Sequence, residues 1–121
     1  MLGPVTPILR SFDEAKARAF YVDWLGFSVT FEHRFGPGLL LCLGLDREDV
    51  ALHLSEHHGD TTPGTRVRIA ATGIRDFYEE LAARPHAGMR PGPPQWQEWG
   101  EWNLTVTDPF GNRLTFHEEG T

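Results

Sequence analysis

The sequence has only one cysteine and no long apolar run, and both shortages limit what the protein can be. Cys42 cannot form an internal disulfide, so a reducing cytoplasm suits the chain, and its place in the apolar run LLLCLGL predicts a buried side chain. No apolar run approaches the roughly 20 residues that a bilayer span requires, and MLGPVTPILRSFDEAK lacks the pattern of a secretory signal. We therefore expect a cytoplasmic protein without a membrane segment.

Basic residues are scarce relative to acidic ones. The 121 residues include 17 Asp and Glu against 11 Lys and Arg, which gives a formal net charge of -6 at pH 7. An acidic protein repels phosphate backbones, so we expect no nucleic-acid partner, whereas cationic small molecules or basic partners are favoured. Because such a charge is also a common means of keeping a protein soluble, it identifies no ligand by itself.

Two common catalytic signatures are missing. The sequence shows no serine or cysteine nucleophile with a partnered base, and it contains no glycine-rich phosphate loop. The stretch HLSEHHGD (53–60) instead places three histidines among two carboxylates, which is the density of ligands found in metal sites. Whether it can hold a metal depends on which way these side chains face.

Apolar and turn residues alternate in an order that predicts two β-α-β-β-β modules in an α+β fold. A polar linker (about 56–64) separates module one (about 1–56) from module two (about 65–121), and we expect one domain over 1–121. An irregular Pro/Gly-rich passage (86–100) interrupts the second module. The predicted helices are 12–24 and 74–85, and the predicted strands are 5–10, 27–35, 39–45, 50–55, 65–71, 101–107 and 113–119.

The first helix has the clearest expected boundaries. Ser11 and Glu14 have the spacing of a capping box, which predicts a helix that begins at Phe12, and Gly26 can supply the left-handed residue that ends it. Apolar residues at three- and four-residue spacing define its packed face: Phe12, Ala15, Ala19, Phe20 and Trp24.

Two long segments resemble the vicinal oxygen chelate superfamily, which contains glyoxalases, extradiol dioxygenases, fosfomycin-resistance enzymes and bleomycin-resistance proteins. VTPILRSFDEAKARAFYVDWLGFSVTFEH resembles the first strand and helix of that superfamily, and EWGEWNLTVTDPFGNRLTFHE resembles its closing hairpin. The resemblance implies the glyoxalase/bleomycin resistance fold, in which an open eight-strand sheet lines a cleft.

Metalloenzymes of this superfamily place one metal ligand on each of four strands. The resemblance aligns these positions with Thr6, His53, Arg66 and Thr115, of which only His53 can bind a metal, because arginine stays protonated. We therefore expect no metal and no other cofactor in the cleft. The remaining histidines, His57 and His58, are expected in a solvated loop beyond the strand end.

Strand alternation and the resemblance together give the candidate ligand-binding residues. Apolar residues such as Leu52 and Leu54 should face the helices, so the polar residues between them should line the cleft. Trp99 precedes Gly100 in a position that resembles the family's tryptophan-glycine lip, whereas Trp102 is expected in the core. The candidate set is His33, Phe35, His53, Ser55, Arg66, Arg68, Trp96, Trp99, Glu101 and Asn103.

A metal-free cleft, an acidic chain and an aromatic lip are similar to the bleomycin-resistance proteins, which sequester a drug and do not transform it. The resemblance implies a homodimer with clefts built from both chains, and a bleomycin-like ligand that is planar and charged. Arg66 and Arg68 would suit an anionic group of the ligand, or would pair with Glu101.

Two alternatives stay open. The first is a divalent-metal-dependent enzyme of the glyoxalase or dioxygenase type, in which the metal polarises the substrate. The second is a metal-free lyase or isomerase in which His53 acts as a base and Arg66 stabilises a developing oxyanion.

Overall fold

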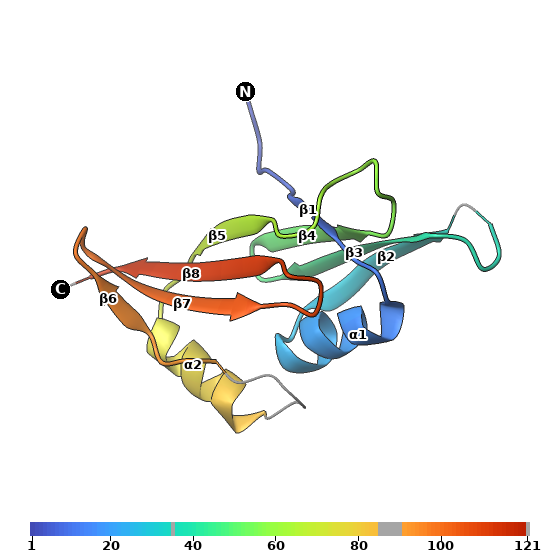
Figure 1. Cartoon of the computed structure of the whole chain (residues 1–121). Helices are drawn as coiled ribbons and strands as arrows, with labels where there is room; N and C mark the ends of the chain where they lie inside the picture. Colours follow the sequence, from blue (N-terminus) through green and yellow to red (C-terminus); the bar gives the residue numbers. More distant parts are fainter. Residues whose placement is uncertain (35, 85–90, 121) are drawn as a thin grey trace.

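The computed structural model describes residues 1–34, 36–84 and 91–120. Its elements follow the order β-α-β-β-β twice along the chain (Figure 1). The first half contains β1 (Ile8–Arg10), α1 (Glu14–Arg18) with its π-helical continuation η1 (Ala19–Trp24), β2 (Ser28–Arg34), β3 (Leu41–Arg47) and β4 (Val50–Ser55). The second half contains β5 (Arg66–Ala70), α2 (Ile74–Ala83), β6 (Gln95–Gln97), β7 (Glu101–Thr107) and β8 (Arg113–Glu119).

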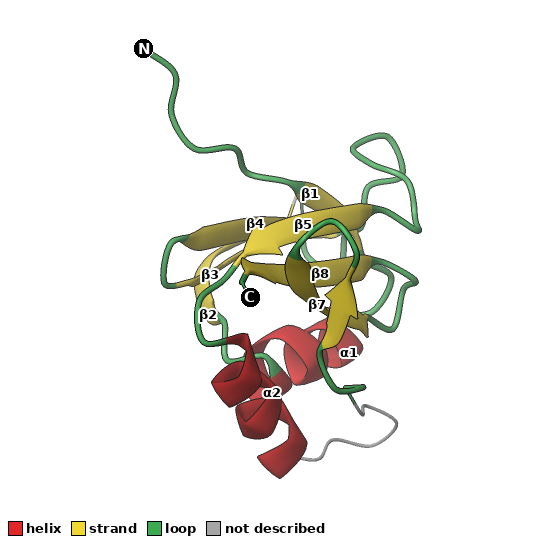
Figure 2. Cartoon of the chain, turned by 90° about the vertical axis from the view of Figure 1, so that its left-hand side faces the viewer, coloured by secondary structure: helices red, strands yellow, loops and turns green. Residues whose placement is uncertain are grey.

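Each half forms its own four-stranded sheet. The strand order is β1-β4-β3-β2 in the first sheet and β5-β8-β7-β6 in the second. The first strand of each half runs parallel to the last one, and the other neighbours are antiparallel. Figure 2 shows both helices on the same side of the strands. The predicted α+β class and the repeated order of elements are therefore confirmed. No helix within the described ranges is long and apolar enough to cross a membrane.

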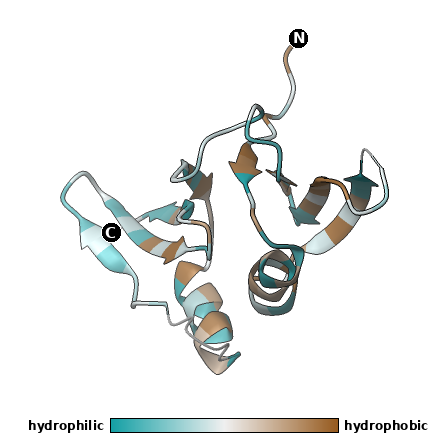
Figure 3. Ribbon diagram, turned by 45° about the vertical axis from the view of Figure 1, so that its right-hand side comes forward, coloured by the Kyte–Doolittle hydropathy of each residue, from teal (hydrophilic) through white to brown (hydrophobic). Residues whose placement is uncertain are grey.

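The two sheets share one hydrophobic core. Leu52 of the first sheet and Leu114 of the second belong to the same buried cluster as Phe20 and Trp24 of η1. Trp24 also donates its indole N–H to the carbonyl oxygen of Leu81 in α2, at 3.1 Å. Because successive strand residues point to opposite faces, every second residue of both sheets points away from this core. Figure 3 shows the resulting alternation of hydrophobic and hydrophilic residues along the strands.

A buried hydrogen-bond network joins the β7–β8 turn to the first half. Asp108 Oδ2 accepts from the Tyr21 hydroxyl at 2.6 Å and from the Asn112 side-chain nitrogen at 2.8 Å. The same nitrogen donates to the carbonyl oxygen of Arg10 at 2.8 Å. Burial, together with the charge of Asp108, raises the pKa of Tyr21 well above its ordinary value. The sequence DPFGN was predicted only as a turn, but it also connects the two halves.

The first helix begins later than its capping-box spacing predicted. Asp13, not Ser11, is the N-cap, since its carboxylate accepts from the backbone N–H of Lys16 at 2.9 Å. The backbone N–H of Ser11 instead pairs with the carbonyl oxygen of Ser55, which extends the β1–β4 contact. Phe12 was predicted on the packed face but is 56% exposed. Tyr21 was not predicted on the packed face but is completely buried, and it follows the buried Ala17 by four residues. The second part of the helix, η1, is π-helical.

The second helix has its N-terminal cap in a distant strand. Gly73 precedes the helix at φ 70° and provides no side chain, whereas Glu118 of β8 accepts from the backbone N–H groups of Gly73 at 3.0 Å and Ile74 at 2.9 Å. These bonds lower the pKa of Glu118. The predicted end of this helix, Pro85, lies outside the described residues. We infer that the long-range cap replaces the local one that the sequence lacks.

Two strand predictions need correction. The passage 86–100 was expected to be irregular, but its described part contains β6, in which Trp96 lies opposite Trp102 of β7. β1 is shorter than the predicted 5–10 and begins after Pro7, which has no backbone N–H to donate.

Candidate functional site: two outward sheet faces

The candidate residues divide between two sheet faces that point away from the shared core. We call these the first open face, on β1–β4, and the second open face, on β5–β8. The pairing registers place residues on each face, with Ile8 opposite His53 in the first sheet and Arg68 opposite Thr115 in the second. The first open face includes Ile8, Phe31, His33, Cys42 and His53, and the second includes Arg66, Arg68, Glu101, Asn103, Thr115 and His117.

At the centre of the first open face, an aromatic ring from β2 packs over a glycine of the neighbouring strand β3. Phe31 lies over Gly44, where an added Cβ would come within 2.2 Å of the ring. The ring also meets the imidazole of His53 edge-on, with 4.9 Å between the ring centres and 89° between the planes. Phe31 remains 39% exposed. This face therefore offers an apolar and aromatic surface at its centre.

Strand β2 turns its charged residues toward the helix. Glu32 pairs with Arg18 of α1, and Arg34 pairs with Glu14 of the same helix. Alternation then places Phe31 and His33 on the first open face, as predicted for His33. The neighbouring candidate Phe35 lies outside the described residues. Cys42, opposite His33, is only half-buried, in contrast to the predicted buried filler, and burial is the main cause of its raised thiol pKa.

The first three residues of HLSEHHGD (53–60) end β4, and the residues after them fold back over Ser55. Ser55 is completely buried, and its hydroxyl donates to Asp60 Oδ2 at 2.6 Å and accepts from the backbone N–H of His57 at 3.1 Å. A ligand could bond to this hydroxyl only after displacing those partners, so the placement does not support Ser55 as a ligand contact. No group of three potential metal-binding side chains occurs anywhere in the ranges that the structure describes.

Glu101 is the centre of the second open face. The residue is 5% exposed, and its carboxylate accepts two bonds from Arg68, at 2.7 and 2.9 Å, and one from the indole N–H of Trp99, at 2.6 Å. His117 Nδ1 lies 3.4 Å from the same carboxylate. The Trp99 bond and then the Arg68 bond lower the pKa of Glu101. The sequence left two partners open for Arg68, an anionic group of the ligand or Glu101, and in the structure Arg68 pairs with Glu101.

Trp99 presents its ring to solvent from a fixed position. It lies in the turn between β6 and β7, just before Gly100, whose φ of 100° suits glycine. Its side chain is 68% exposed although its N–H is bonded to Glu101. When the amide of Asn103 is oriented to satisfy both of its polar atoms, its nitrogen also lies 3.1 Å from Glu101 Oε1. The arrangement combines a stacking surface with a guanidinium and amide donors.

Trp96 is separated from this group. It lies opposite Trp102, with 5.4 Å between the ring centres, on the face of the second sheet that also carries the core residue Leu104. Trp102 packs against the core, as predicted. The structure therefore does not bring Trp96 together with Trp99, because Trp96 pairs with Trp102 in β6 while Trp99 lies in the turn after β6 and bonds to Glu101.

The register also corrects the alignment of the metal positions. Thr6 lies before β1, and the residue opposite His53 is Ile8; in the second sheet, the residue opposite Thr115 is Arg68 and not Arg66. Thr115 is buried and hydrogen-bonded to Thr105, with 2.9 Å between the hydroxyl oxygens. An isoleucine, a guanidinium and an engaged hydroxyl do not form a donor set for a divalent cation, so the metal used by the superfamily's enzymes does not fit these residues.

Three residues on these faces were not among the candidates predicted from the sequence. His117 follows Arg113 and Thr115 at a spacing of two, so the alternation that identified those residues also predicts its side. Phe31 precedes His33 by two residues and could have been found in the same way. Ile8 could not, because its position depends on the parallel register of β1 with β4.

Comparison with known proteins places the whole chain in one family. The sequence profile described as Glyoxalase superfamily protein matches residues 2–121. None of the curated proteins compared with the chain matches it significantly in sequence. A glyoxalase family protein of known structure from Bacillus anthracis is 20% identical, with a TM-score of 0.73, and the match covers 99% of this chain and 97% of that one.

Two solved structures of bleomycin-binding proteins are also similar. One, complexed with bleomycin, is 25% identical with a TM-score of 0.76, and the match covers 98% of this chain and 100% of that one. The other, from bleomycin-producing Streptomyces verticillus and complexed with copper(II)-bleomycin, is 27% identical with a TM-score of 0.76, over 100% of this chain and 98% of that one. The chain belongs to the glyoxalase superfamily, as its resemblance to the vicinal oxygen chelate proteins predicted.

Proposed function

We propose that this protein is a metal-independent binding protein that sequesters a planar, charged small molecule of the bleomycin type. The observation that carries the proposal is the Trp99–Glu101–Arg68 group on the second open face. The bond to Glu101 restricts the Trp99 ring in advance, so a planar ligand can stack on it with a smaller loss of side-chain entropy. The two similar bleomycin-binding structures support the same reading.

We further propose that the binding cleft forms between two copies of the chain. The two open faces point away from a common core, so the candidate residues of one chain do not meet around one ligand. A twofold dimer could place the first open face of one copy opposite the second open face of the other, which would create two identical clefts. The exposed apolar residues Ile8 and Phe31 of the first open face are consistent with a surface that becomes covered.

The enzymatic alternatives find less support. A metal-dependent reaction would need anionic or neutral donors where this chain has Ile8 and Arg68. A metal-free reaction would need a partner that orients His53 as a base, but its ring is packed against Phe31. Within the described residues, no carboxylate is paired with His53.

The test is a fluorescence titration of metal-stripped protein with metal-free bleomycin. We expect saturable quenching at one drug per cleft, and we expect Trp99→Ala to weaken binding about tenfold through the loss of stacking. Trp96→Ala is the matched control, because it removes an exposed tryptophan from the other side of the sheet and should leave the affinity nearly unchanged. Absence of binding, with about one metal per chain in the untreated sample, would contradict the proposal and favour an enzyme.

Mixed dimers test the shared cleft. Phe31→Ala and Trp99→Ala change different open faces, so a mixed dimer would have one cleft with both changes and one cleft with neither. With free exchange of subunits, about one quarter of all clefts would regain full affinity. If the site lay within one chain, mixing would restore nothing. An unchanged affinity of Phe31→Ala alone would also contradict the shared cleft.

A further inference from the structure

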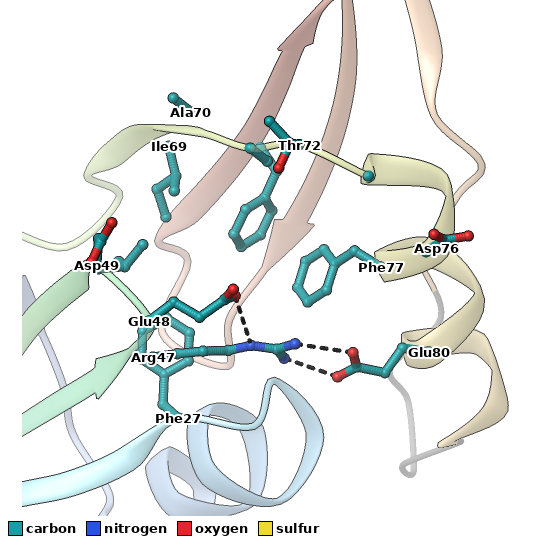
Figure 4. Close-up of a pocket in the computed structure, with 14 residues that line it drawn as sticks. Phe27, Arg47, Glu48, Asp49, Ile69, Ala70, Thr72, Asp76, Phe77 and Glu80 are labelled. Atoms are coloured by element: carbon teal, nitrogen blue, oxygen red, sulfur yellow. Dashed lines mark hydrogen bonds and ion pairs between the residues drawn. The ribbon is translucent and has the colours of Figure 1, made fainter.

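A separate cleft lies between the two halves on the helix side of the sheets. It has a volume of about 510 Å³ and is lined by the β3–β4 turn, the end of β5 and the first turns of α2 (Figure 4). This volume is within the range of small-molecule sites, roughly 300 to 1,000 Å³. None of the residues that define the two open faces lines it. Any ligand of this cleft would therefore be distinct from the ligand proposed for the open faces.

The floor of the cleft is apolar and aromatic. Phe27, Ile69 and Phe116 are almost fully buried in the core and still line the cleft. Phe77 of α2 stands beside Phe116, with 4.8 Å between the ring centres and 65° between the planes. A flat apolar group placed here would replace water on a surface of ring edges and aliphatic carbons.

The one cationic side chain of the described lining is fully engaged. Arg47 forms two bonds of 2.9 Å with Glu80, donates to the carbonyl oxygen of Leu25 at 2.6 Å and lies over Phe77, 5.0 Å from the ring centre. These contacts leave its charge paired and occupy one face of Phe77. An anionic ligand would therefore have to displace Glu80 to reach a positive partner in the described lining.

Carboxylates form the rim on two sides. Glu48 and Asp49 come from the β3–β4 turn, and Asp76 comes from α2 on the other side of the cleft (Figure 4). Glu48 lies 3.7 Å from Arg47 and is largely exposed, and Glu80 is shared by Arg47 and Arg84. Asp49 and Asp76 form no ion pair with any residue that the structure describes, so they give the rim its negative charge next to the apolar floor.

We propose that this cleft binds a small organic cation with a flat apolar body and a protonated amine. The body would lie on the Phe27, Ile69 and Phe116 floor, and the amine would reach one rim carboxylate, that of Asp49 on one side of the cleft or that of Asp76 on the other. Charge complementarity favours a cation over an anion of the same shape, and the apolar floor favours an aromatic amine over a bare polyamine. This inference goes beyond the proposed function, since it concerns another surface and another ligand.

The experiment is a titration of the full chain with 1-naphthylmethylamine, followed by backbone amide NMR shifts. We expect saturable shifts at Ala71, Thr72 and Gly73, and an affinity that falls as ionic strength rises. The double variant Asp49→Asn with Asp76→Asn should weaken binding about tenfold, because it removes both exposed rim carboxylates that the amine can reach. Glu79→Gln, which removes an exposed carboxylate of α2 outside the cleft, is the matched control and should bind normally.

Two further comparisons make the outcome decisive. 1-Naphthoate has the same flat body with the opposite charge and should not shift these amides. Trp99→Ala should bind the amine as wild type does, so failure of the open-face proposal and failure of this one are distinguishable. Equal shifts with the amine and with naphthoate, or full affinity in the double variant with an unchanged melting temperature, would overturn the proposal.

Discussion

In the first sheet, Gly44 lies opposite His53 and lets Phe31 cross the strand, whereas the corresponding positions of the second sheet hold Thr105 and Thr115, which hydrogen-bond to each other. On the next strand, the residue opposite His53 is Ile8 in the first sheet, and the residue opposite Thr115 is Arg68 in the second. The two sheets have the same strand order, yet one open face is aromatic and the other is charged. The comparison teaches that the shared core determines the topology, while the outward positions of each half can differ freely.

The largest expected effect concerns the glycine that distinguishes the first sheet. Gly44→Ala places a methyl group within 2.2 Å of the Phe31 ring, so we expect a loss of about 2 kcal/mol in the free energy of unfolding. Thr105→Ala at the corresponding position removes one hydroxyl bond and should lower it by about 1 kcal/mol or less. Urea denaturation of both variants measures the difference. Equal losses would show that the two faces are not packed differently.

The next effect concerns the carboxylate that organises the second sheet. Glu101→Ala removes the partner of both Arg68 and Trp99, so we expect the affinity for bleomycin to fall about tenfold or more because the stacking ring is no longer held in place. The titration used for wild type measures it. Glu98→Ala changes an exposed carboxylate of the same turn and should leave the affinity unchanged. If both variants bound equally well, Glu101 would have only a structural role.

The response to pH should separate the two faces further. The pKa of Glu101 lies below its ordinary value of 4.5, so the ionised carboxylate stabilises the Trp99 contact at all pH values above that range. This contribution is lost only as the pH falls through the lowered pKa. We expect Trp99 emission, taken as the difference between wild type and Trp99→Phe, to stay constant from pH 7 to about 4.5 and to change below it. In Glu101→Gln the acidic transition should be absent, and a transition that persisted in this variant would contradict control by Glu101.

The smallest effect is expected at His53. Its imidazole meets Phe31 edge-on and forms no ion pair with any described residue, so His53→Ala should weaken ligand binding by only about threefold. Isothermal titration calorimetry would measure the change. A loss of a hundredfold or more would restore His53 to the centre of the function and favour the metal-free enzyme.

Local patterns predicted the parts of the fold that depend on neighbouring residues. The alternation of Leu52 and Leu54 and of Leu114 and Phe116 correctly identified the inner faces, because strand residues alternate whatever lies across from them. The same rule placed Arg68 and Glu101 on one face. The π-helical turn was not predictable in this way, since nothing in the spacing of Phe20 and Trp24 distinguishes it from an α-helix.

The unexpected contacts at the site come from loops and turns that fold back onto the strands, and the cap of α2 comes from a residue distant in sequence. Ser55 lies on the predicted strand, but Asp60 folds over it, and that contact depends on the path of the linker. Trp96 was placed with Trp99 because both lie in one Pro/Gly-rich passage, whereas the pairing with Trp102 turns it to the other side. The cap of α2 by Glu118 connects positions 44 residues apart and has no local signature.

The network of Tyr21, Asp108 and Asn112 also has a consequence for the order of events during synthesis. Tyr21 and Asp108 are separated by 87 positions, and Asn112 and Arg10 by 102. On the ribosome, the aromatic residues of η1 are therefore made long before the turn that covers Tyr21 leaves the exit tunnel. Contacts of such long range form slowly, because a large loop must close before they contribute. Until that turn has been released, Tyr21 of the nascent first half lacks its hydrogen-bond partner Asp108.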